Sequence, residues 1–473
     1  MSVTLTFTHD LVTHAERSHW TVIGRKHLLG DPAILSLLPS LPEGVWTEML
    51  GKGDPGDHGR TATTYTGTRP SRLTAAILPE ACSRHNTPSR AAAIPGLVKT
   101  LNKESAIVAV LERPEHALAF AAAIARCLHR FPKSASYSVP VRLVCAQPVS
   151  LEHCQAAAEA VLQASEWVDT PPNVLDTHAL VARAQAIAER HPQVEILTIQ
   201  GQEVAEAGLG GIWAVGQASI SPPAFVVLDY RPSGATQRIG WVGKGITYDT
   251  GGLSLKSKFG MPSMKNDMAG AAAVLSSFEA AVRLGYPQEI TAVLCIAENS
   301  VGPNAMRPDD IITLFSGQTV EVNNTDAEGR LILADGLAWL VKNRNLHEIV
   351  DLATLTGHRL ATGKRHAGFY CNEEAFERRA VAAGHRSGDL GFPLFYAPEF
   401  LREEFQTSIA DMKNSAKDRE NAPSSAAAQF LAGHLGNFQG GWLHVDMAAP
   451  AFVNGRGTGF GVALLLALYG DGA

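Results

Sequence analysis

Residues 241–269 read WVGKGITYDTGGLSLKSKFGMPSMKNDMA, and this stretch decides the fold class. The apolar run Ile239–Val242 predicts a buried strand that ends at Val242, just before Lys244. A glycine-rich polar segment follows, and the apolar spacing then predicts a helix over 268–284 that Gly285 stops. A buried strand, a polar loop and a helix in succession are typical of α/β proteins.

The same pattern recurs along the C-terminal part of the chain. A further helix is predicted over 330–342, and further strands are predicted at Phe225–Leu228, Ile290–Ile296, Ile349–Leu352 and Leu443–Val445. Short, continuously apolar strands between helices favour a mostly parallel sheet covered on both faces. We therefore predict an α/β protein with a smaller N-terminal α/β domain, residues 1–165, and a larger C-terminal catalytic domain, residues 166–473, whose mostly parallel central sheet is flanked by helices.

The composition limits the possible partners. The 473 residues are 45% apolar and 18% charged, with a formal net charge of −6, which is ordinary for a globular protein and gives no electrostatic case for nucleic acid or an anionic membrane. The first residues, MSVTLTFTHD, lack the basic and apolar regions of a secretory signal, and none of the six cysteines forms a CxxC pair. We expect a cytoplasmic protein with reduced thiols, no membrane partner and no nucleic-acid partner.

A second polar segment, Glu321–Ala334, reads EVNNTDAEGRLILA. If this stretch is extended, then Asp326, Glu328 and Arg330, which alternate, project to one side just before the apolar helix. The positive end of that helix would also favour an anion at this point.

Four carboxylates would share one pocket if both polar segments meet at the carboxyl ends of neighbouring strands: Asp249, Asp267, Asp326 and Glu328. Unpaired carboxylates so close together repel one another, and two divalent cations would neutralise them. Oxygen ligands suit Mg²⁺ or Mn²⁺ and also admit Zn²⁺. Another interpretation stays open, in which the acids pair with Lys244, Lys256, Lys265 and Arg330.

These segments closely resemble the leucyl aminopeptidase (cytosol aminopeptidase) family. The resemblance rests on VGKGITYDTGGLSLK and NNTDAEGRLILADGLAW, with support from MKNDMAGAAAVL, DLATLTG and the TPPN at 170–173. The chain departs from the usual family pattern at Tyr248, Thr250, Asn323, His358 and 423–425 (PSS). These departures resemble the branch of probable aminopeptidase-like proteins and make a preference for leucine less secure.

The resemblance implies a metal-dependent aminopeptidase that uses a water activated by two metals to hydrolyse the N-terminal residue from short peptides. Lys244 would bind one metal through its neutral amine, Asp249 and Glu328 would bridge the two, Asp267 would complete the tighter site, and Asp326 would ligate at the looser site. The metals would be zinc or manganese, with magnesium or cobalt as further options.

The resemblance also implies roles for residues that bind no metal. Lys256 would polarise the scissile carbonyl and stabilise the gem-diolate, and Arg330 would hold a bicarbonate ion that moves the proton. Gly329 and Leu355 would help to hold that ion, and the first side-chain pocket would be lined by Met264, Thr354 and Gly357. The family forms hexamers, so we expect a homohexamer.

Two other functions remain as alternatives. The first is a non-proteolytic scaffold or a DNA-binding member of the same family. The second is a different dinuclear hydrolase, such as a phosphoesterase; such sites are generally rich in histidine, and neither polar segment contains one.

Overall fold

The computed structural model describes residues 3–10, 12–51, 53–98, 101–131, 136–357 and 359–470. The chain divides into two compact units. Unit 1 comprises Met1–Leu162, Ala382–Leu390 and Ala463–Ala473, and unit 2 comprises Gln163–Val381 and Gly391–Val462. Three helices contain residues of both units: α7 (Leu151–Asp169), α14 (Glu374–Ser387) and α17 (Val462–Tyr469).

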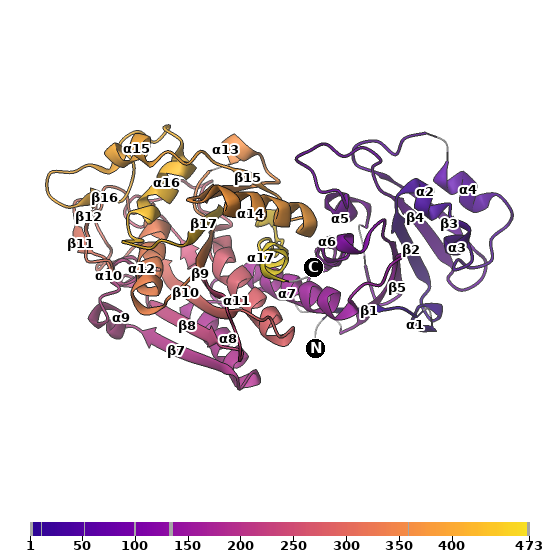
Figure 1. The fold of residues 1–473 in the computed structure, drawn as a ribbon, viewed down its shortest axis with the longest axis horizontal. Coiled ribbons are helices and arrows are strands. Elements are labelled where there is room, and N and C mark those ends of the chain that lie inside the picture. The colour runs from indigo at the N-terminus through magenta and orange to yellow at the C-terminus, as the bar shows by residue number, and fades with distance from the viewer. Residues whose placement is uncertain are drawn as a thin grey trace. The chain divides into compact units, whose positions relative to one another are not determined.

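Unit 1 contains a six-stranded sheet in the order β1-β6-β5-β2-β4-β3, which is parallel except at the edge strand β3. Its strands are β1 (Thr4–Thr8), β2 (His19–Gly24), β3 (Arg60–Tyr65), β4 (Arg72–Ile77), β5 (Ser105–Val110) and β6 (Ser138–Val144). The helical segments of residues 12–125 are α1 (Val12–Ala15), α2 (Lys26–Leu29), α3 (Pro32–Leu35), α4 (Val45–Leu50), η1 (Ala91–Ala93), α5 (Ile94–Leu97), η2 (Pro114–His116) and α6 (Ala117–Ala125). Figure 1 shows α2 and α4 on one face of this sheet and α5 and α6 on the other.

Hydrogen bonds connect the C-terminal segments of unit 1 with its N-terminal segment and with each other. Asp389 is fully buried, and its carboxylate accepts from Arg126 Nη2 at 2.5 Å and from the main-chain N–H of Leu464 at 3.3 Å. The Thr87 hydroxyl donates to the main-chain oxygen of His385 at 2.9 Å. Unit 1 is therefore built from parts of the chain that lie far apart in sequence.

Unit 2 is built on an eight-stranded sheet in the order β15-β14-β17-β13-β9-β10-β8-β7. The four central strands β17, β13, β9 and β10 are parallel to one another. Antiparallel pairing joins β8 to both β10 and β7, and β14 to β17. Its strands are β7 (Val194–Gln200), β8 (Ala224–Tyr230), β9 (Arg238–Asp249), β10 (Glu289–Asn299), β13 (Glu348–Ala353), β14 (Ala367–Cys371), β15 (Gly391–Pro393) and β17 (Gly441–Asp446). The predicted mostly parallel sheet is confirmed.

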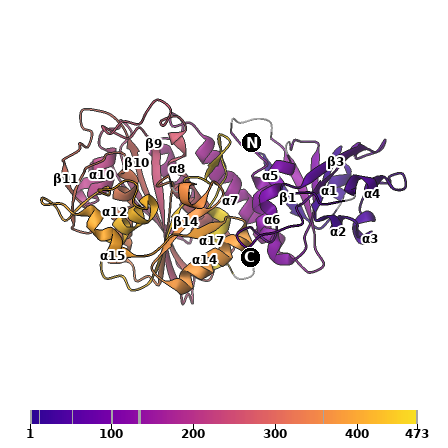
Figure 2. The same ribbon diagram turned by 90° about the horizontal axis from the view of Figure 1, so that it is seen from above.

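Helices cover both faces of this sheet. Figure 2 shows α10 and α12 on one side of β9 and β10 and α8 on the other. The helical segments are α8 (Thr177–Arg190), α9 (Gln202–Glu206), α10 (Gly210–Gly216), η3 (Met264–Asn266), α11 (Ala269–Arg283), α12 (Glu328–Asn343), α13 (Arg359–Thr362), α15 (Pro398–Leu401), η4 (Arg402–Phe405) and α16 (Pro423–Ala432). Two small sheets complete the unit: β11 (Ile311–Thr313) with β12 (Thr319–Glu321) and β16 (Met412–Lys413), and β18 (Phe452–Val453) with β19 (Arg456–Gly457).

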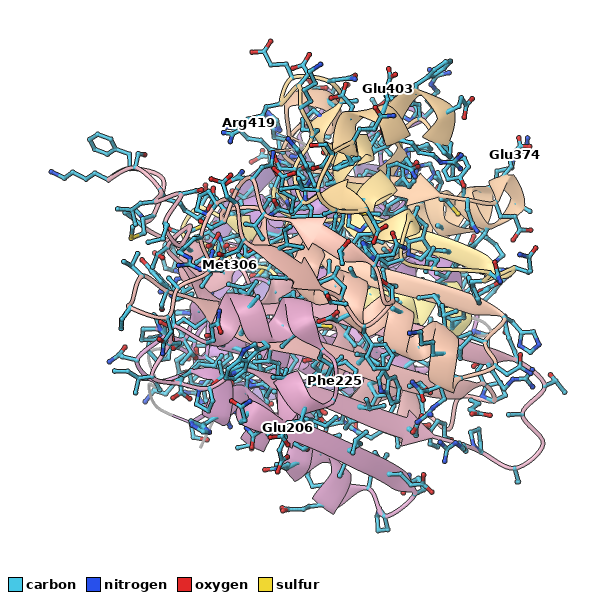
Figure 3. The ribbon with its side chains drawn as sticks, turned by 90° about the vertical axis from the view of Figure 1, so that its left-hand side faces the viewer. Glu206, Phe225, Met306, Glu374, Glu403 and Arg419 are labelled. Carbon is cyan, nitrogen blue, oxygen red and sulfur yellow. The ribbon has the colours of Figure 1, made fainter. Side chains whose placement is uncertain are left out.

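The core of unit 2 lies between the sheet and α10, α12 and α16. Phe225 of β8, Tyr370 of β14 and Trp442 of β17 are fully buried there. Figure 3 places Phe225 among the inner side chains, whereas Glu206, Glu374 and Glu403 lie at the outside. In the described part of the chain, we find no helix both long enough and apolar enough to cross a membrane.

The strand that bears Lys244 is longer than predicted. We expected it to end at Val242, but β9 continues to Asp249, so Lys244 lies inside a buried strand and not in a loop. Glycines permit this extension, because a Cβ on Gly243 would lie 2.5 Å from the Cα of Ala271 in α11. The close approach of the strand and the helix therefore requires a glycine at this position of β9.

Candidate metal centre

The candidate site lies at the carboxyl edge of the central strands of unit 2. Parallel strands end at the same edge, and β9 and β10 end there in Asp249 and Asn299, which face each other in the register after a bulge. The side-chain amide of Asn299 donates to Asp249 Oδ1 at 2.8 Å and to the main-chain oxygen of Thr325 at 3.0 Å. Asn299 thus connects the end of β9 to the segment that carries Asp326.

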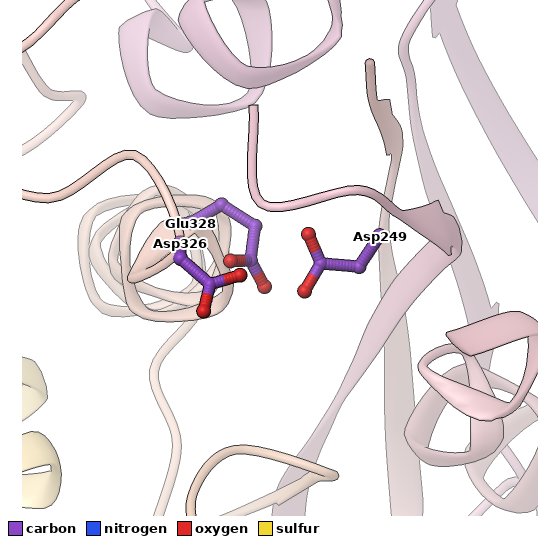
Figure 4. Close-up of side chains that lie close together, drawn as sticks. All are labelled: Asp249, Asp326 and Glu328. Carbon is purple, nitrogen blue, oxygen red and sulfur yellow. The ribbon is translucent and has the colours of Figure 1, made fainter. Parts of the chain in front are cut away.

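Three of the predicted acids converge at this edge. Asp249, Asp326 and Glu328 each offer one carboxylate oxygen, and these oxygens lie within 4.8 Å of one another. Figure 4 shows the three carboxylates turned toward a common point. Asp326 lies two residues before α12, and Glu328 is its first residue. Oxygen atoms at this spacing could share a divalent cation.

Lys244 brings the fourth acid into the same cluster. Its Nζ lies 2.8 Å from Asp267 Oδ1 and 2.9 Å from Glu328 Oε1. The ammonium also donates to the main-chain oxygen of Thr354 at 3.1 Å, and the Thr354 hydroxyl donates to Asp267 Oδ1 at 2.7 Å. Lys244 and Asp267 are therefore fixed from several sides deep in the unit.

Lys256 contacts the other side of the cluster. Its Nζ lies 2.7 Å from Asp249 Oδ2 and 2.5 Å from Asp326 Oδ1. The Lys256 side chain is 16% exposed, whereas that of Lys244 is 3% exposed. The more accessible ammonium is therefore the one that a bound substrate could reach.

Two lysines do not neutralise four carboxylates. Burial and the negative charge of Asp249 raise the pKa of Glu328, and burial raises the pKa of Asp267 despite the adjacent Lys244. Burial lowers the pKa of Lys244 and of Lys256, but the surrounding carboxylates outweigh it, so both pKa values lie above the usual range. The lysine pairs expected in the other interpretation are thus present, yet negative charge remains in excess.

Two buried oxygen atoms show where further positive charge fits. Asp267 Oδ2 and Glu328 Oε2 have no hydrogen-bond partner among the described residues. A buried carboxylate oxygen without a partner is costly. The excess negative charge, the unpartnered oxygens and the oxygen-rich donor set therefore fit divalent cations.

Arg330 does not follow Asp326 and Glu328 in an extended segment, although the Glu328 carboxylate acts on its pKa. That prediction is wrong because α12 begins at Glu328, and residues two apart in a helix do not share a face. Arg330 Nη1 donates to the main-chain oxygen of Asn414 at 2.9 Å, and its Nε is buried with no partner among the described residues. Burial lowers the pKa of Arg330 to about 10.

A glycine at position 329 leaves room for the Lys244 side chain. A Cβ at this position would lie 2.6 Å from Lys244 Nζ and 2.9 Å from Leu355 Cδ1. Gly357 differs, because a Cβ there would meet no heavy atom of the described residues within 4 Å. Met264 is half-buried in η3. His358 lies outside the described residues.

Asn414 is a site residue that sequence reasoning missed. It is fully buried, and its Oδ1 accepts from the main-chain N–H groups of Asn323 and Asn324 at 2.9 and 3.2 Å. Its Nδ2 donates to the main-chain oxygen of Asn324 at 2.7 Å. Because its own main-chain oxygen accepts from Arg330, Asn414 fixes both the segment before Asp326 and the guanidinium. No signal in the sequence distinguishes it from other asparagines.

Asp446 is a second buried residue that supports the site and that sequence reasoning missed. Its Oδ1 accepts from the main-chain N–H of Leu355 at 3.1 Å, and its Oδ2 accepts from the Thr356 hydroxyl at 2.5 Å. The Thr356 hydroxyl also lies 2.6 Å from Ser424 Oγ. Ser424 belongs to a departure from the usual family sequence, so this departure contacts the loop that would line a substrate pocket.

Comparison with known proteins places these features in context. The sequence profile described as "Cytosol aminopeptidase family, catalytic domain" matches residues 163–466, and that of "M17 aminopeptidase N-terminal domain 2" matches residues 57–136. The human protein "Probable aminopeptidase NPEPL1" is 44% identical over 476 residues, which cover 97% of this chain and 88% of that protein.

Solved structures of similar fold include leucyl aminopeptidase from Trypanosoma brucei in complex with bestatin. It is 34% identical, with a TM-score of 0.92, over 99% of this chain and 96% of that one. The bottromycin maturation enzyme BotP in complex with Mn is 27% identical, with a TM-score of 0.81, over 96% of this chain and 98% of that one.

Proposed function

The chain belongs to the cytosol aminopeptidase family and is a metal-dependent aminopeptidase, and from this premise we propose that it releases the N-terminal residue of short, unblocked peptides at a two-metal site in unit 2. The observation that carries the proposal is the carboxylate cluster at the ends of β9 and β10. Its negative charge exceeds what Lys244 and Lys256 supply, and two of its oxygens lack partners among the described residues.

The residues that would hold the cations are Lys244, Asp249, Asp267, Asp326 and Glu328. Two bound divalent cations would lower the pKa of a water molecule and polarise the scissile carbonyl. Asp249, Asp326 and Glu328 form the convergent oxygen set, and Lys244 with Asp267 lies directly beside it. Lys244 would have to release a proton from Nζ to become a ligand. Mn²⁺ and Zn²⁺ are the leading candidates, with Mg²⁺ and Co²⁺ as further options, and the solved structure of the similar enzyme BotP is a complex with Mn.

Lys256 would act on the substrate carbonyl. Its ammonium is the accessible one of the pair, and Asp249 and Asp326 hold it at the edge of the cluster. Negative charge develops on the carbonyl oxygen as the bond to the attacking water forms. A positioned ammonium stabilises that charge more strongly in the transition state than in the substrate complex.

Arg330 would hold an anion that accepts the proton. An arginine cannot act as the base itself. Its buried Nε has an unused donor, and the N-terminus of α12 adds partial positive charge nearby. We propose that bicarbonate binds there, with Gly329 and Leu355 beside it.

The substrate would bind by its free amine and its first side chain. The free α-amine would take an open position on one of the bound cations, which would explain a requirement for an unblocked N-terminus. Met264, Thr354 and Gly357 would line a modest apolar pocket for the first side chain. We also propose, from the family resemblance, that the protein is a homohexamer and acts in the cytoplasm, as the name of the 41% identical Streptomyces coelicolor relative "Probable cytosol aminopeptidase" suggests for that protein.

The test is an assay of N-terminal residue release by the metal-replete protein. We expect metal-dependent release from unblocked peptides and none from their N-acetylated forms. If a broad peptide panel gives no turnover with either Mn²⁺ or Zn²⁺, the peptidase proposal is wrong and a scaffold or DNA-binding role takes its place. Hydrolysis of phosphate esters in place of peptides would instead indicate a phosphoesterase.

A further inference from the structure

Unit 1 contains a cavity at the point in its sheet where a parallel fold binds ligands. β2 and β5 are parallel neighbours, but β2 leads through α2–α4 and β3 to β4, whereas β5 leads through α6 to β6 on the opposite side. Connections that diverge in this way leave a crevice beyond the carboxyl ends of the two strands. Arg25 directly follows β2, and Glu112 and Arg113 follow β5 by two and three residues.

The cavity has a volume of about 370 Å³. This lies within the range of roughly 300–1,000 Å³ that is usual for small-molecule sites. Its lining comes from the ends of both strands, from the segment that contains Pro88, from η2, and from the end of α14. All of these residues belong to unit 1, so the cavity is complete within that unit.

The lining carries an excess of positive charge. Four arginines, Arg25, Arg90, Arg113 and Arg386, stand against two glutamates, Glu112 and Glu115. Glu80, which is not part of the lining, accepts from Arg25 Nη2 at 2.7 Å; even when it is counted, positive charge remains in excess. A concave lining with this excess of positive charge favours an anion.

Glutamates fix the inner arginines in place. Arg25 Nη1 lies 2.7 Å from Glu112 Oε1, and Arg90 Nη1 lies 3.8 Å from Glu112 Oε2. Arg90 Nη2 donates to the main-chain oxygen of Glu80 at 2.8 Å, but its buried Nε has no hydrogen-bond partner among the described residues. The side chain of Arg90 is only 11% exposed, so Arg90 contributes positive charge to the lining while its Nε stays buried in the unit.

The outer arginines have charge available for a ligand. The side chain of Arg113 is 68% exposed, and its 3.5 Å pair with Glu115 is of the exposed kind that contributes little. Arg386 Nη2 donates to the main-chain oxygen of Ala467 at 2.7 Å, which holds the guanidinium in position without neutralising it.

Phosphate oxygens suit the arginines of this lining. Arginine side chains recognise such oxygens by paired hydrogen bonds. The η2 segment, which lines the cavity with Glu115 and His116, continues directly into α6. The main-chain N–H of Ala117 donates to the main-chain oxygen of Pro114, so the arginine side chains must supply the donors for a ligand.

We propose that unit 1 binds an organic phosphate of nucleotide size in this cavity. Arg113 and Arg386 would hold the phosphate dianion, and Arg25 and Arg90 would add positive charge to the lining. Pro88 and the aliphatic parts of the arginines would contact the remainder. The site is separate from the aminopeptidase residues, so its occupation does not depend on the proposed reaction.

The test is calorimetric titration of the full-length protein with adenosine monophosphate, adenosine and inorganic phosphate. We expect saturable binding of the monophosphate, which weakens as the salt concentration rises because exposed charges are screened. Adenosine should bind at least tenfold more weakly. If inorganic phosphate bound as tightly as the monophosphate, the organic part of the proposal would be wrong and free phosphate would be the ligand.

Substitutions locate the binding. Arg113→Ala and Arg386→Ala should each weaken monophosphate binding by at least tenfold. Arg378→Ala removes an exposed arginine of the same helix α14, which is paired with Glu374 outside the cavity, and should have no effect. Arg113→Ala should retain full aminopeptidase activity, which shows that the protein is folded even if Arg386→Ala is unstable. No binding at millimolar monophosphate, or equal binding by Arg113→Ala and the unaltered protein, would overturn the proposal.

Discussion

The side-chain amide of Asn299 donates to Asp249 Oδ1 at 2.8 Å, and this bond joins the ends of two neighbouring strands at the candidate site. Residues that orient a metal ligand commonly change metal affinity by about 10–100-fold when they are replaced. We expect Asn299→Ala to weaken metal binding by about this factor and to regain activity in excess metal. Metal content after dialysis, measured together with activity, checks this. Asn343→Ala, at the exposed end of α12, serves as the control.

Removing one carboxylate charge should empty the site. Glu328→Gln and Asp326→Asn keep the shape of the side chain but lose a charged ligand, so both variants should lose most bound metal and most activity. Metal analysis of the purified variants tests this, with Glu374→Gln, an exposed acid on α14, as the matched control. A Glu328→Gln protein that retained both metals would show that Glu328 does not bind them.

Replacing Lys256 should lower turnover and leave the metal content unchanged. We expect Lys256→Ala to keep its metals and lose about 10²–10³-fold in kcat, which is typical for loss of one oxyanion-stabilising group. Lys258→Ala, an exposed neighbour in the same loop, should behave like the unaltered protein. Loss of metal in Lys256→Ala would mean that the division of roles between the two lysines is wrong.

Two glycines allow a sharp steric test. Gly329→Ala places a Cβ within 2.6 Å of Lys244 Nζ and should displace the lysine, so metal binding and activity should fall together. Gly357→Ala introduces the same group where no atom of the described residues lies within 4 Å, and its metal content should be unchanged. Equal metal content in the two variants would contradict a fixed position for Lys244 at the metal site.

A buried ion pair should make stability depend on pH. His444 Nδ1 lies 2.6 Å from Asp351 Oδ1 with both side chains fully buried; burial lowers the pKa of His444, but Asp351 outweighs it and the net shift is upward. The pair therefore contributes stability fully below the unfolded pKa of about 6.5, and this contribution is lost as pH rises through the higher folded value.

Urea unfolding between about pH 6 and pH 9 measures this effect. His444→Gln should remove the part of the decline in the free energy of unfolding that comes from the pair. His434→Gln should leave the decline unchanged, because burial lowers the pKa of His434 to about 4 and the residue is neutral throughout this range. A decline of the same slope in His444→Gln would contradict the prediction.

The sequence predicted the centre of unit 2 well. The five predicted strands correspond to β8, β9, β10, β13 and β17, and the two predicted helices correspond to α11 and α12. Buried parallel strands are continuously apolar, so they stand out from their surroundings. The edge strand β7 did not stand out, because most of its residues are partly or fully exposed.

The metal ligands were predictable, but their supports were not. Lys244, Asp249 and Glu328 lie in long polar segments that interrupt apolar elements. Asn414 and Asp446 are single polar residues, and they lie 84 or more positions after the residues they hold. Only the pairing of the strands brings such residues together. The extent of β9 could not be predicted either, since its glycines indicate a turn unless the packing of α11 is known.

The salt bridge between Arg126 and the buried Asp389 has a consequence for biosynthesis. Its two residues are 263 positions apart, although both belong to unit 1. At roughly 5–20 residues per second, a ribosome needs roughly 10 to 50 s to synthesise the residues between them. The early part of unit 1 therefore waits until about three-quarters of unit 2 has been synthesised before this salt bridge can form, and during that time the incomplete unit is exposed to chaperones and proteases.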